Sequence, residues 1–340
     1  MSVTPLSTEP VIELTGVGKT YHFHRTRPGL SGSIRDLFGR QYGERVAVDD
    51  LDLQIGSGEF VGLLGRNGAG KTTTLKMLSG LLRPSIGRVR VLGYEPYRRG
   101  FDFLRQIAIV LGNKTMLWWD VSTMANLELY QALYDLSDSD FRTSVAELAE
   151  LLELQDHLDI PVRKLSLGER MKCELMLALV HRPKVLFLDE PTIGLDVISK
   201  AAIRRFLTRT CAQRGTTIIL TSHDMDDVEQ LCPRVVLIDH GRLQFDGSPE
   251  QLVRATQPRK QVTCSYAADP EQPAKWPIGV RPVAANGPQL RLEVERDALP
   301  GLLAEVPRWG TLVDLEIGDA ELDEVMQSVL AGNLGDRTVR

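Results

Sequence analysis

The sequence of 340 residues is poor in cysteine, and its four cysteines are widely scattered: Cys173, Cys211, Cys232 and Cys264. No two of them form a C-x-x-C pair, so neither a cysteine metal site nor a disulfide framework is expected, and this usage fits a reducing cytosol. The chain also lacks an uninterrupted apolar run of membrane-spanning length, and its first residues lack the pattern of a signal peptide. If the protein works at a membrane, we therefore expect it to work from the side, through another chain.

An excess of positive charge is also missing. Lys and Arg together number 40 against 45 for Asp and Glu, which gives a formal net charge of −5. This balance argues against nucleic acid as the main partner. The remaining composition is that of a soluble globular protein, and the length suggests about two domains, each able to bury a core.

What the chain does contain is a glycine-rich stretch between a strand-like run and a helical pattern. The stretch reads Gly65-Arg66-Asn67-Gly68-Ala69-Gly70-Lys71-Thr72-Thr73. Strand, then G-x-x-x-x-G-K-[ST], then helix is the phosphate-binding P-loop, in which glycines let backbone N–H groups converge on an anion at a helix N-terminus. We expect Lys71 to reach the outer phosphates and Thr72 to place its hydroxyl on Mg²⁺.

Two other strand-like runs end in chemically capable side chains. The apolar run 185–188 is followed by Asp189 and Glu190, and residues 216–222 are followed by His223. In a P-loop enzyme Asp189 is predicted to hold Mg²⁺, Glu190 to accept a proton from the attacking water, and His223 to hold the γ-phosphate or orient the water. The alternative for the carboxylates is a solvated strand end. Strands that alternate with helices predict a largely parallel α/β sheet with its site at the strand C-termini.

Two further motifs complete an ordered set. They are Leu165-Ser166-Leu167-Gly168-Glu169 before a helix, and Gly194-Leu195-Asp196. The P-loop at 65–72, the signature at 165–169, Asp189-Glu190, Gly194-Leu195-Asp196 and His223 follow one another in this order. Together they resemble the nucleotide-binding subunits of ATP-binding-cassette (ABC) transporters over about residues 11–245. The chain looks most like subunits of the ABC-2-type exporter class with short six-helix permeases. The excursion between Tyr21 and Val46 also resembles the ATPases of polysaccharide exporters.

The resemblance implies a P-loop NTPase fold with a RecA-like parallel sheet core, an antiparallel β subdomain and a helical subdomain. It implies ATP and Mg²⁺ as cofactors, a head-to-tail dimer of two ATPase subunits, with a homodimer favoured, and integral-membrane permease subunits as partners. Each ATP would lie between the P-loop residues of one subunit and the signature of the other. The residues implied to bind nucleotide are Tyr21, Gly65, Arg66, Asn67, Gly68, Ala69, Gly70, Lys71, Thr72, Thr73, Asn113, Ser166, Gly168 and Asp196.

Three of these residues have particular implied roles. By resemblance, Asp196 crosses the dimer interface and Tyr21 stacks on adenine, although Tyr21 also fits a half-buried strand position. Asn113 stands where the family usually has glutamine; it keeps the amide with roughly 1.5 Å less reach. We hypothesise that Asn113 still ligates Mg²⁺, directly or through water. The signature also departs from the family, with Leu167 for glycine and Glu169 for glutamine.

The expected domains are a nucleotide-binding domain over residues 1–247 and a small α+β domain over 248–340 that serves dimerisation or regulation. Within the first, residues 22–45 form a basic insert and residues 114–160 a helical subdomain. Ser33 and Asp36 predict a short amphipathic helix in the insert, which either touches lipid or a membrane partner or is a plain surface excursion. Trp118 and Trp119 either line the groove for the permease or pack in the core. A last helix is expected after Asp319.

The sequence-based interpretation is an ATPase at the cytoplasmic face of the cell membrane that powers export of a drug, lipid or glycoconjugate. An associated solute-binding protein would instead indicate import. The alternative is a soluble ABC ATPase that acts on a non-membrane target, although such proteins usually carry two cassettes or a long coiled-coil insertion. A regulator that does not hydrolyse nucleotide is disfavoured by the presence of Glu190 and His223.

Overall fold

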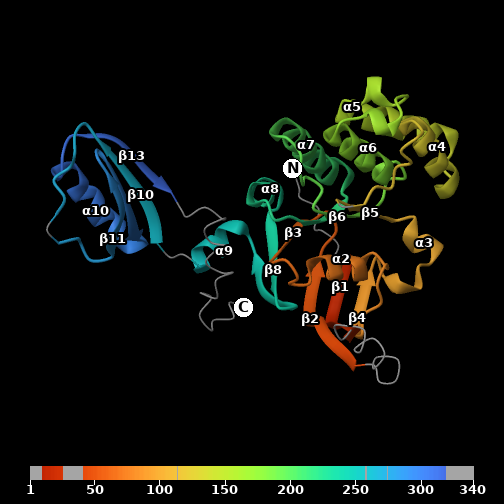
Figure 1. Ribbon diagram of the computed structural model, residues 1–340, viewed down its shortest axis with the longest axis horizontal. Helices are drawn as coiled ribbons and strands as arrows, with labels where there is room; N and C mark the ends of the chain where they lie inside the picture. Colours follow the sequence, from red (N-terminus) through yellow and green to blue (C-terminus); the bar gives the residue numbers. More distant parts are fainter. Residues whose placement is uncertain (1–9, 26–40, 113, 257–258, 274, 319–340) are drawn as a thin grey trace, which may run out of the picture. The chain divides into compact units, whose positions relative to one another are not determined.

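The structure, a computed structural model, describes residues 10–25, 41–112, 114–256, 259–273 and 275–318. The chain divides into two compact units, residues 1–246 and 247–340. The first unit contains a six-stranded sheet, a three-stranded sheet and most of the helices, which confirms the expected α/β class (Figure 1).

The six-stranded sheet has the order β5-β6-β7-β3-β8-β9, and its pairs from β5 to β8 are parallel. Strands β3, β6 and β7 are buried along their whole length, as expected of the continuous apolar runs of a parallel sheet. Leu111, Asp189 and Thr221 lie in register at the carboxyl ends of three neighbouring strands. The strands are β3 (Phe60–Leu64), β5 (Ile107–Leu111), β6 (Val185–Asp189), β7 (Thr217–Thr221), β8 (Arg234–Asp239) and β9 (Arg242–Gly247).

The three-stranded sheet is antiparallel, with β1 (Ile12–Arg25) between β2 (Gln41–Ile55) and β4 (Ile86–Val91). Its apolar side chains share one core with helix α2 (Lys71–Leu78) and with strands β3 and β6. Figure 1 shows α2 between this sheet and the parallel one. Burial of α2 between two sheets holds the turn that precedes it in place.

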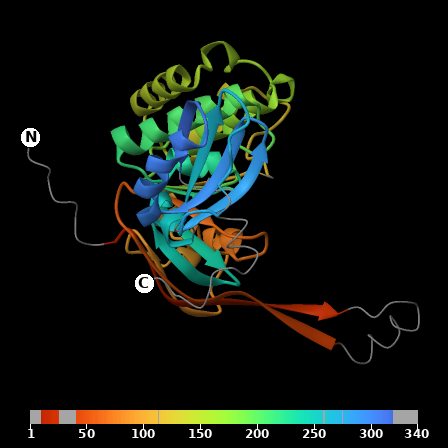
Figure 2. The same ribbon diagram turned by 90° about the vertical axis from the view of Figure 1, so that its left-hand side faces the viewer.

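The pairing of β1 with β2 continues further than expected. Residues 22–25 and 41–45, which we assigned to the insert, are arms of a long hairpin whose register runs through Tyr21↔Arg45 to Arg25↔Gln41. Figure 2 shows these two strands running out of the body side by side. The expected short helix at Ser33 and Asp36 lies outside the described residues.

Helices cover the other side of the parallel sheet (Figure 1). Each of the five main ones begins at a side-chain cap, namely Ser122, Ser137, Ser166, Asp196 or Asp224, whose oxygen accepts a hydrogen bond from the first turn. The helices on this side are α4 (Thr123–Tyr134), α5 (Asp138–Leu152), α6 (Leu167–Leu179), α7 (Val197–Arg214) and α8 (Met225–Leu231). Helix α3 (Phe101–Leu104) instead contributes Phe103 to the core that contains α2. Short 3₁₀ turns are η1 (Pro96–Arg98), η2 (Gln155–His157) and η3 (Val162–Lys164).

The second unit is a four-stranded antiparallel sheet with the order β11-β12-β10-β13 and its own core. In that core Trp276 meets Trp309 edge to face, with ring centroids 5.5 Å apart. Its elements are α9 (Pro249–Thr256), β10 (Arg259–Tyr266), β11 (Val280–Asn286), β12 (Gln289–Glu295), η4 (Arg296–Ala298), α10 (Leu299–Glu305), η5 (Val306–Arg308) and β13 (Leu312–Gly318). The helix expected after Asp319 lies outside the described residues.

Among the helices of the described residues, none combines the length and the apolar character that crossing a membrane requires.

Candidate active site

The glycine-rich turn takes a backbone course that side chains would block. Gly65, Gly68 and Gly70 all have positive φ, and a Cβ on Gly65 or Gly70 would overlap the carbonyl oxygen of Ile238 or Ala47. The turn is therefore held between β8 and β2, with its end at the first residue of α2. Such a turn presents its N–H groups in the manner of an anion-binding nest.

Lys71 opens α2 and is folded back over this turn. Its ammonium group donates to the carbonyl oxygens of Gly65 at 2.5 Å and Arg66 at 3.1 Å. Burial lowers the pKa of Lys71, and the charges of Glu190 and Asp189 oppose that shift. The side chain is only 7% exposed, so an incoming phosphate would meet a cation that is already largely stripped of water.

A pocket of about 380 Å³ opens beside the turn. Residues from β1, β2, the turn and the end of β6 line it: Tyr21, Phe23, Arg45, Ala47, Arg66, Asn67, Gly68, Gly70, Lys71, Thr72, Thr73 and Glu190. Tyr21 is half-buried, and the ammonium of Lys19 lies 5.5 Å from its ring centroid. Both interpretations of Tyr21 fit this position, since a strand residue here also faces the pocket.

Asp189 is the buried acid of the site. One of its oxygens accepts hydrogen bonds from Thr72 at 3.1 Å and from Thr221 at 2.6 Å. A hydroxyl next to a carboxylate is a hard oxygen donor set, which suits Mg²⁺ when phosphates and waters supply the other ligands. In the described part of the chain no three His, Cys, Asp or Glu side chains gather as a metal site, so the nucleotide would have to complete this one.

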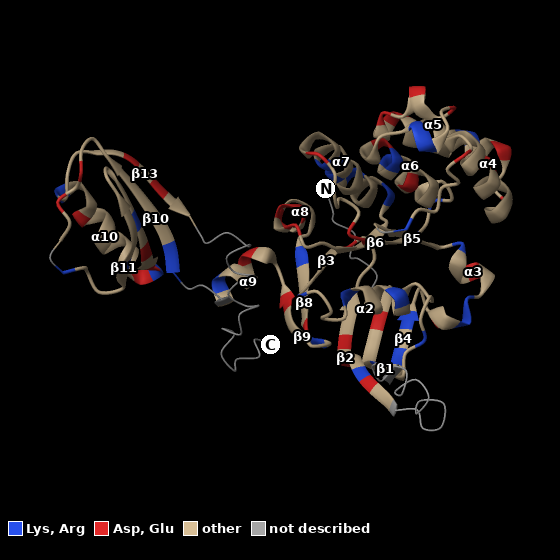
Figure 3. Ribbon diagram, viewed as in Figure 1, with Lys and Arg blue, Asp and Glu red and all other residues tan. Residues whose placement is uncertain are grey.

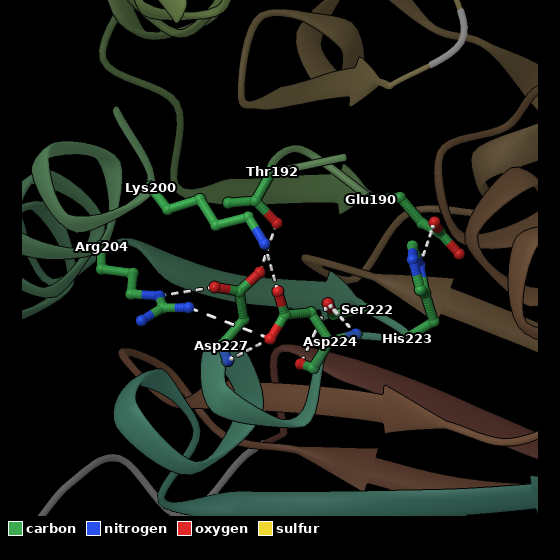
Figure 4. A network of polar contacts seen from close by, with 8 residues as sticks. All are labelled: Glu190, Thr192, Lys200, Arg204, Ser222, His223, Asp224 and Asp227. Carbon is green, nitrogen blue, oxygen red and sulfur yellow. Dashed lines mark hydrogen bonds and ion pairs between the residues drawn. The ribbon is translucent and has the colours of Figure 1, made fainter. Parts of the chain in front are cut away.

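Glu190 and His223 face each other from the ends of β6 and β7. Their side chains meet at 2.6 Å, between Oε2 of Glu190 and Nδ1 of His223 (Figure 4). A carboxylate accepts from a ring N–H, so Nδ1 carries the proton in this arrangement. The backbone of Glu190 has φ +56°, a conformation that costs a non-glycine residue of order 1 kcal/mol and that often marks functional sites.

Asn113, our third candidate Mg²⁺ ligand, lies outside the described residues. The preceding Gly112 is described, and its N–H donates to the carbonyl of Asp189 at 2.7 Å. A Cβ on Gly112 would collide with the carbonyl oxygen of Glu190. The loop that begins there is therefore set directly against the backbone of the candidate base.

The signature residues form a second cluster. Ser166 caps α6 in a reciprocal capping box with Glu169, and a Cβ on Gly168 would collide with Ser199 near the start of α7. Asp196 caps α7 by accepting from the backbone N–H of Ser199 at 2.9 Å. None of the three predicted nucleotide ligands, Ser166, Gly168 and Asp196, lines the P-loop pocket of the same chain.

Glu169, which replaces the family's glutamine, has its own bonds. Its carboxylate accepts from the N–H of Ser166 at 2.7 Å and lies 3.0 Å from Nε2 of His157. The Ser166 N–H, and secondarily His157, hold the pKa of Glu169 below its usual value. The signature of this chain therefore carries a full negative charge in its first turn.

Trp118 and Trp119 are 64% and 49% exposed, so the core-packing alternative for them is wrong. Trp119 lines a hollow of about 260 Å³ with Leu111, Gly112, Lys114, Thr115, Leu167, Arg170, Met171 and Glu174. The guanidinium of Arg170 lies 5.1 Å from the Trp119 ring centroid. Glu174 is buried and accepts from the Thr115 hydroxyl and the Met116 N–H, which fastens the segment between β5 and α4 to α6.

Sequence reasoning missed Arg45 and Phe23. Both line the P-loop pocket, and a terminal nitrogen of Arg45 lies 2.9 Å from the point where a Cβ on Gly68 would stand. The signal that could have found them is the strand register, which sets Arg45 opposite Tyr21. Assigning 22–45 to an insert hid that register.

A comparison with protein families matches residues 48–193 to the family described as ABC transporter. Among curated proteins, the chain is 34% identical over 206 residues to the ABC transporter ATP-binding protein NatA of Bacillus subtilis, covering 61% of this chain and 83% of that protein. It is 37% identical to daunorubicin resistance ATP-binding protein DrrA3 of Streptomyces coeruleorubidus, covering 64% and 68%. It is 38% identical to Nod factor export ATP-binding protein I of Paraburkholderia xenovorans, covering 64% and 71%.

Solved structures give the same fold. CbiO1 of Clostridium perfringens, described as part of the ABC transporter complex cbiONQ, superposes with a TM-score of 0.58 at 26% identity over 72% of this chain and 90% of its own. A dimeric ATP-binding cassette in a post-hydrolysis state with ADP and Pi has a TM-score of 0.58 at 22% identity over 70% and 98%. These likenesses confirm the P-loop NTPase fold expected from the sequence.

Proposed function

Because this chain belongs to the family of ABC transporter ATP-binding proteins, we propose that its ATP hydrolysis drives export through separate membrane permease subunits. Export is preferred to import because relatives are named for drug resistance and for Nod factor export. The substrate is accordingly proposed to be a drug, lipid or glycoconjugate. The site of action would be the cytoplasmic face of the cell membrane.

The roles of the residues follow from their positions. The N–H groups of the P-loop and Lys71 would hold the ATP phosphates, with Tyr21 against the base. Thr72 and Asp189 would hold Mg²⁺, whose positive charge would neutralise part of the negative charge of the phosphates. Glu190 would accept the proton of the attacking water, and the ring N–H of His223 would keep that carboxylate oriented.

The observation that supports a dimer is the separation of the P-loop pocket from the signature residues. Ser166, Gly168 and Asp196 do not line the pocket that holds Lys71, so one chain offers only half of a closed nucleotide site. Next to Asp196, Val197 and Ile198 are 83% and 82% exposed. Adjacent apolar side chains at a helix start are candidates for burial by a partner, and a second copy of the chain would supply it.

The hollow at Trp119 supports a protein partner of the permease type. It is largely apolar, has an aromatic rim with Arg170 above the ring, and begins at the loop after β5. A helix of the permease that entered it would press on the segment that starts at Gly112. The alternative partner, nucleic acid, is less favoured because β2, α5 and α6 carry both charge signs in place of a continuous basic face (Figure 3).

The test of hydrolysis is the ATPase rate of the purified protein. We expect Glu190→Gln to lower kcat by at least about 100-fold because the proton acceptor is lost, while nucleotide binding persists. We expect Lys71→Ala to weaken binding itself. Glu150→Gln, an exposed carboxylate on α5, is the matched control. Hydrolysis by Glu190→Gln at the wild-type rate would contradict the proposed mechanism.

The test of the partner is purification of the tagged chain from detergent-solubilised membranes. We expect an integral-membrane protein to co-purify and to be lost when Trp119 is changed to Asp, with the ATPase of the free subunit retained. Recovery of the wild-type chain without any membrane protein would favour a soluble ABC ATPase.

A further inference from the structure

A closed group of polar side chains lies beside the Glu190–His223 pair (Figure 4). On α7, Lys200 binds the carboxylate of Asp224, and Arg204 donates from Nε to Asp227 at 2.5 Å. Arg204 also approaches Asp224 at 3.9 Å. The second oxygen of Asp227 accepts from the hydroxyl of Thr192. The group therefore contains two cations and two carboxylates, and the Thr192 hydroxyl donates to one of those carboxylates.

The group is shielded from water, which makes its geometry stiff. The side chain of Asp227 is 1% exposed, that of Arg204 14% and that of Lys200 25%. Charged hydrogen bonds in such surroundings are strong and are costly to break one at a time. The positions of α7, α8 and the segment after β6 are consequently fixed relative to one another.

The group is linked to both members of the catalytic pair through the backbone. Thr192 follows Glu190 by two residues, and the N–H of Ile193 donates back to the Glu190 carbonyl at 3.4 Å. Asp224 directly follows His223, and its N–H donates to the Ser222 hydroxyl at 3.0 Å, which closes a tight turn around His223. The backbone at each end of the pair is therefore joined to a segment that carries a member of the group.

Helix α7 supplies the third connection. Lys200 lies one turn after the cap residue Asp196, to whose carbonyl its N–H donates at 2.9 Å. Val197 and Ile198, the exposed apolar residues, occupy the turn between them. A displacement of this helix start would therefore act on Asp224 through Lys200.

We propose that Lys200, Arg204, Asp224, Asp227 and Thr192 form a polar strut that positions Glu190 and His223 for hydrolysis and ties them to the exposed start of α7. The proposal rests on the proposed ATPase function. These five are positioning residues. None of them lines the P-loop pocket, and they act on Glu190 and His223 through the backbone contacts described above. Contact of a second subunit with Val197 and Ile198 would reach the catalytic pair by this route.

The first experiment breaks the strut from α7. Lys200→Met removes the ammonium group but keeps the aliphatic stem. We expect kcat for ATP to fall about 10-fold, because misplacement of a catalytic group by less than 1 Å is costly, while KM stays within about twofold. Lys200→Arg, which retains a cationic donor, restores kcat to within about threefold. Arg205→Met removes an exposed cation from the same helix and serves as the control with wild-type kinetics.

The second experiment breaks the strut from the other end. Thr192→Val keeps the shape and removes the hydroxyl that Asp227 accepts from, and we expect the same loss in kcat with unchanged KM. Thr192→Ser restores it. Binding of a fluorescent ATP analogue and the thermal midpoint are measured for each variant, so that a loss in kcat is scored on folded, nucleotide-binding protein.

Two results overturn the strut. One is wild-type kcat in both Lys200→Met and Thr192→Val; the other is a loss that appears in KM and analogue binding instead of kcat. Wild-type protein and Glu190→Gln are assayed beside them. If wild type hydrolyses ATP and Glu190→Gln does not, the proposed function holds and a negative result counts against the strut alone.

Discussion

At the scale of single residues, Lys71 and Arg45, two of the three cations that line the P-loop pocket, lie in different surroundings. Lys71 is buried and bonded to carbonyl oxygens of its own loop. Arg45 is exposed, and within the described residues no carboxylate forms an ion pair with it. Lys71 is therefore already in position for a phosphate, whereas Arg45 places a terminal nitrogen close to Gly68.

We expect Arg45→Gln to raise KM for ATP about fivefold with little change in kcat. An exposed charge-assisted contact to the nucleotide is worth about 1 kcal/mol, and it weakens with salt. The measurement is KM at low and high ionic strength, with a smaller salt dependence in the variant. Arg90→Gln, exposed on β4 of the same sheet, is the control. An unchanged KM at low salt would mean that Arg45 makes no contact with the nucleotide.

The sequence was sufficient to predict which residues meet at the strand ends. Gly70, Lys71, Thr72 and Glu190 line one pocket, and Asp189 bonds to Thr72, because motif spacing and buried parallel strands impose that geometry. It was insufficient for Arg45, whose position depends on a cross-strand register, and for Thr192 and Asp227, whose contact joins positions 35 residues apart. Their assigned chemical roles stay predictions.

At the scale of elements, His181, just after the end of α6, contacts both α4 and β5. The ring of His181 stacks on Tyr134 at the end of α4, with centroids 3.9 Å apart, and its Nε2 lies 3.1 Å from the carbonyl of Ile107 on β5. Burial lowers the pKa of His181 to about 4, and the Ile107 carbonyl opposes that shift. The helical elements thus meet the sheet through a neutral imidazole.

This imidazole makes stability depend on pH. Between about pH 6.5 and 4 the unfolded chain binds a proton at His181 that the folded chain does not, so stability falls as the pH falls through this window, by up to about 3 kcal/mol. We expect His181→Phe, which keeps the stack on Tyr134, to show a smaller loss of unfolding free energy between pH 7 and pH 5. Urea denaturation at both pH values measures it. His22→Gln, an exposed histidine, should keep the wild-type slope; an identical slope in His181→Phe would contradict the assignment.

At the scale of the whole molecule, the two units have separate cores that share no residue. Every residue that lines the P-loop pocket lies before position 246, and so does every member of the strut. The first unit therefore contains all the groups that we propose for ATP hydrolysis. A regulatory or dimerisation role for the second unit stays a prediction.

We expect a chain truncated after residue 247 to fold, to bind ATP and to retain a basal ATPase rate within about threefold of wild type. The physical reason is that a unit with a hydrophobic core of its own can fold alone. Calorimetry of the intact chain should show two transitions, of which ATP raises only one. Loss of nucleotide binding in the truncated chain would show that the units depend on each other.

The close packing of Gly112 restricts which residues can occupy its position. Its Cα lies so near the Glu190 carbonyl that even a methyl group would not fit. We therefore expect substitutions in the loop that leads to the hollow at Trp119 to be tolerated only beyond Gly112. In a library of substitutions across residues 110–116, Gly112 should be the position that tolerates substitution least.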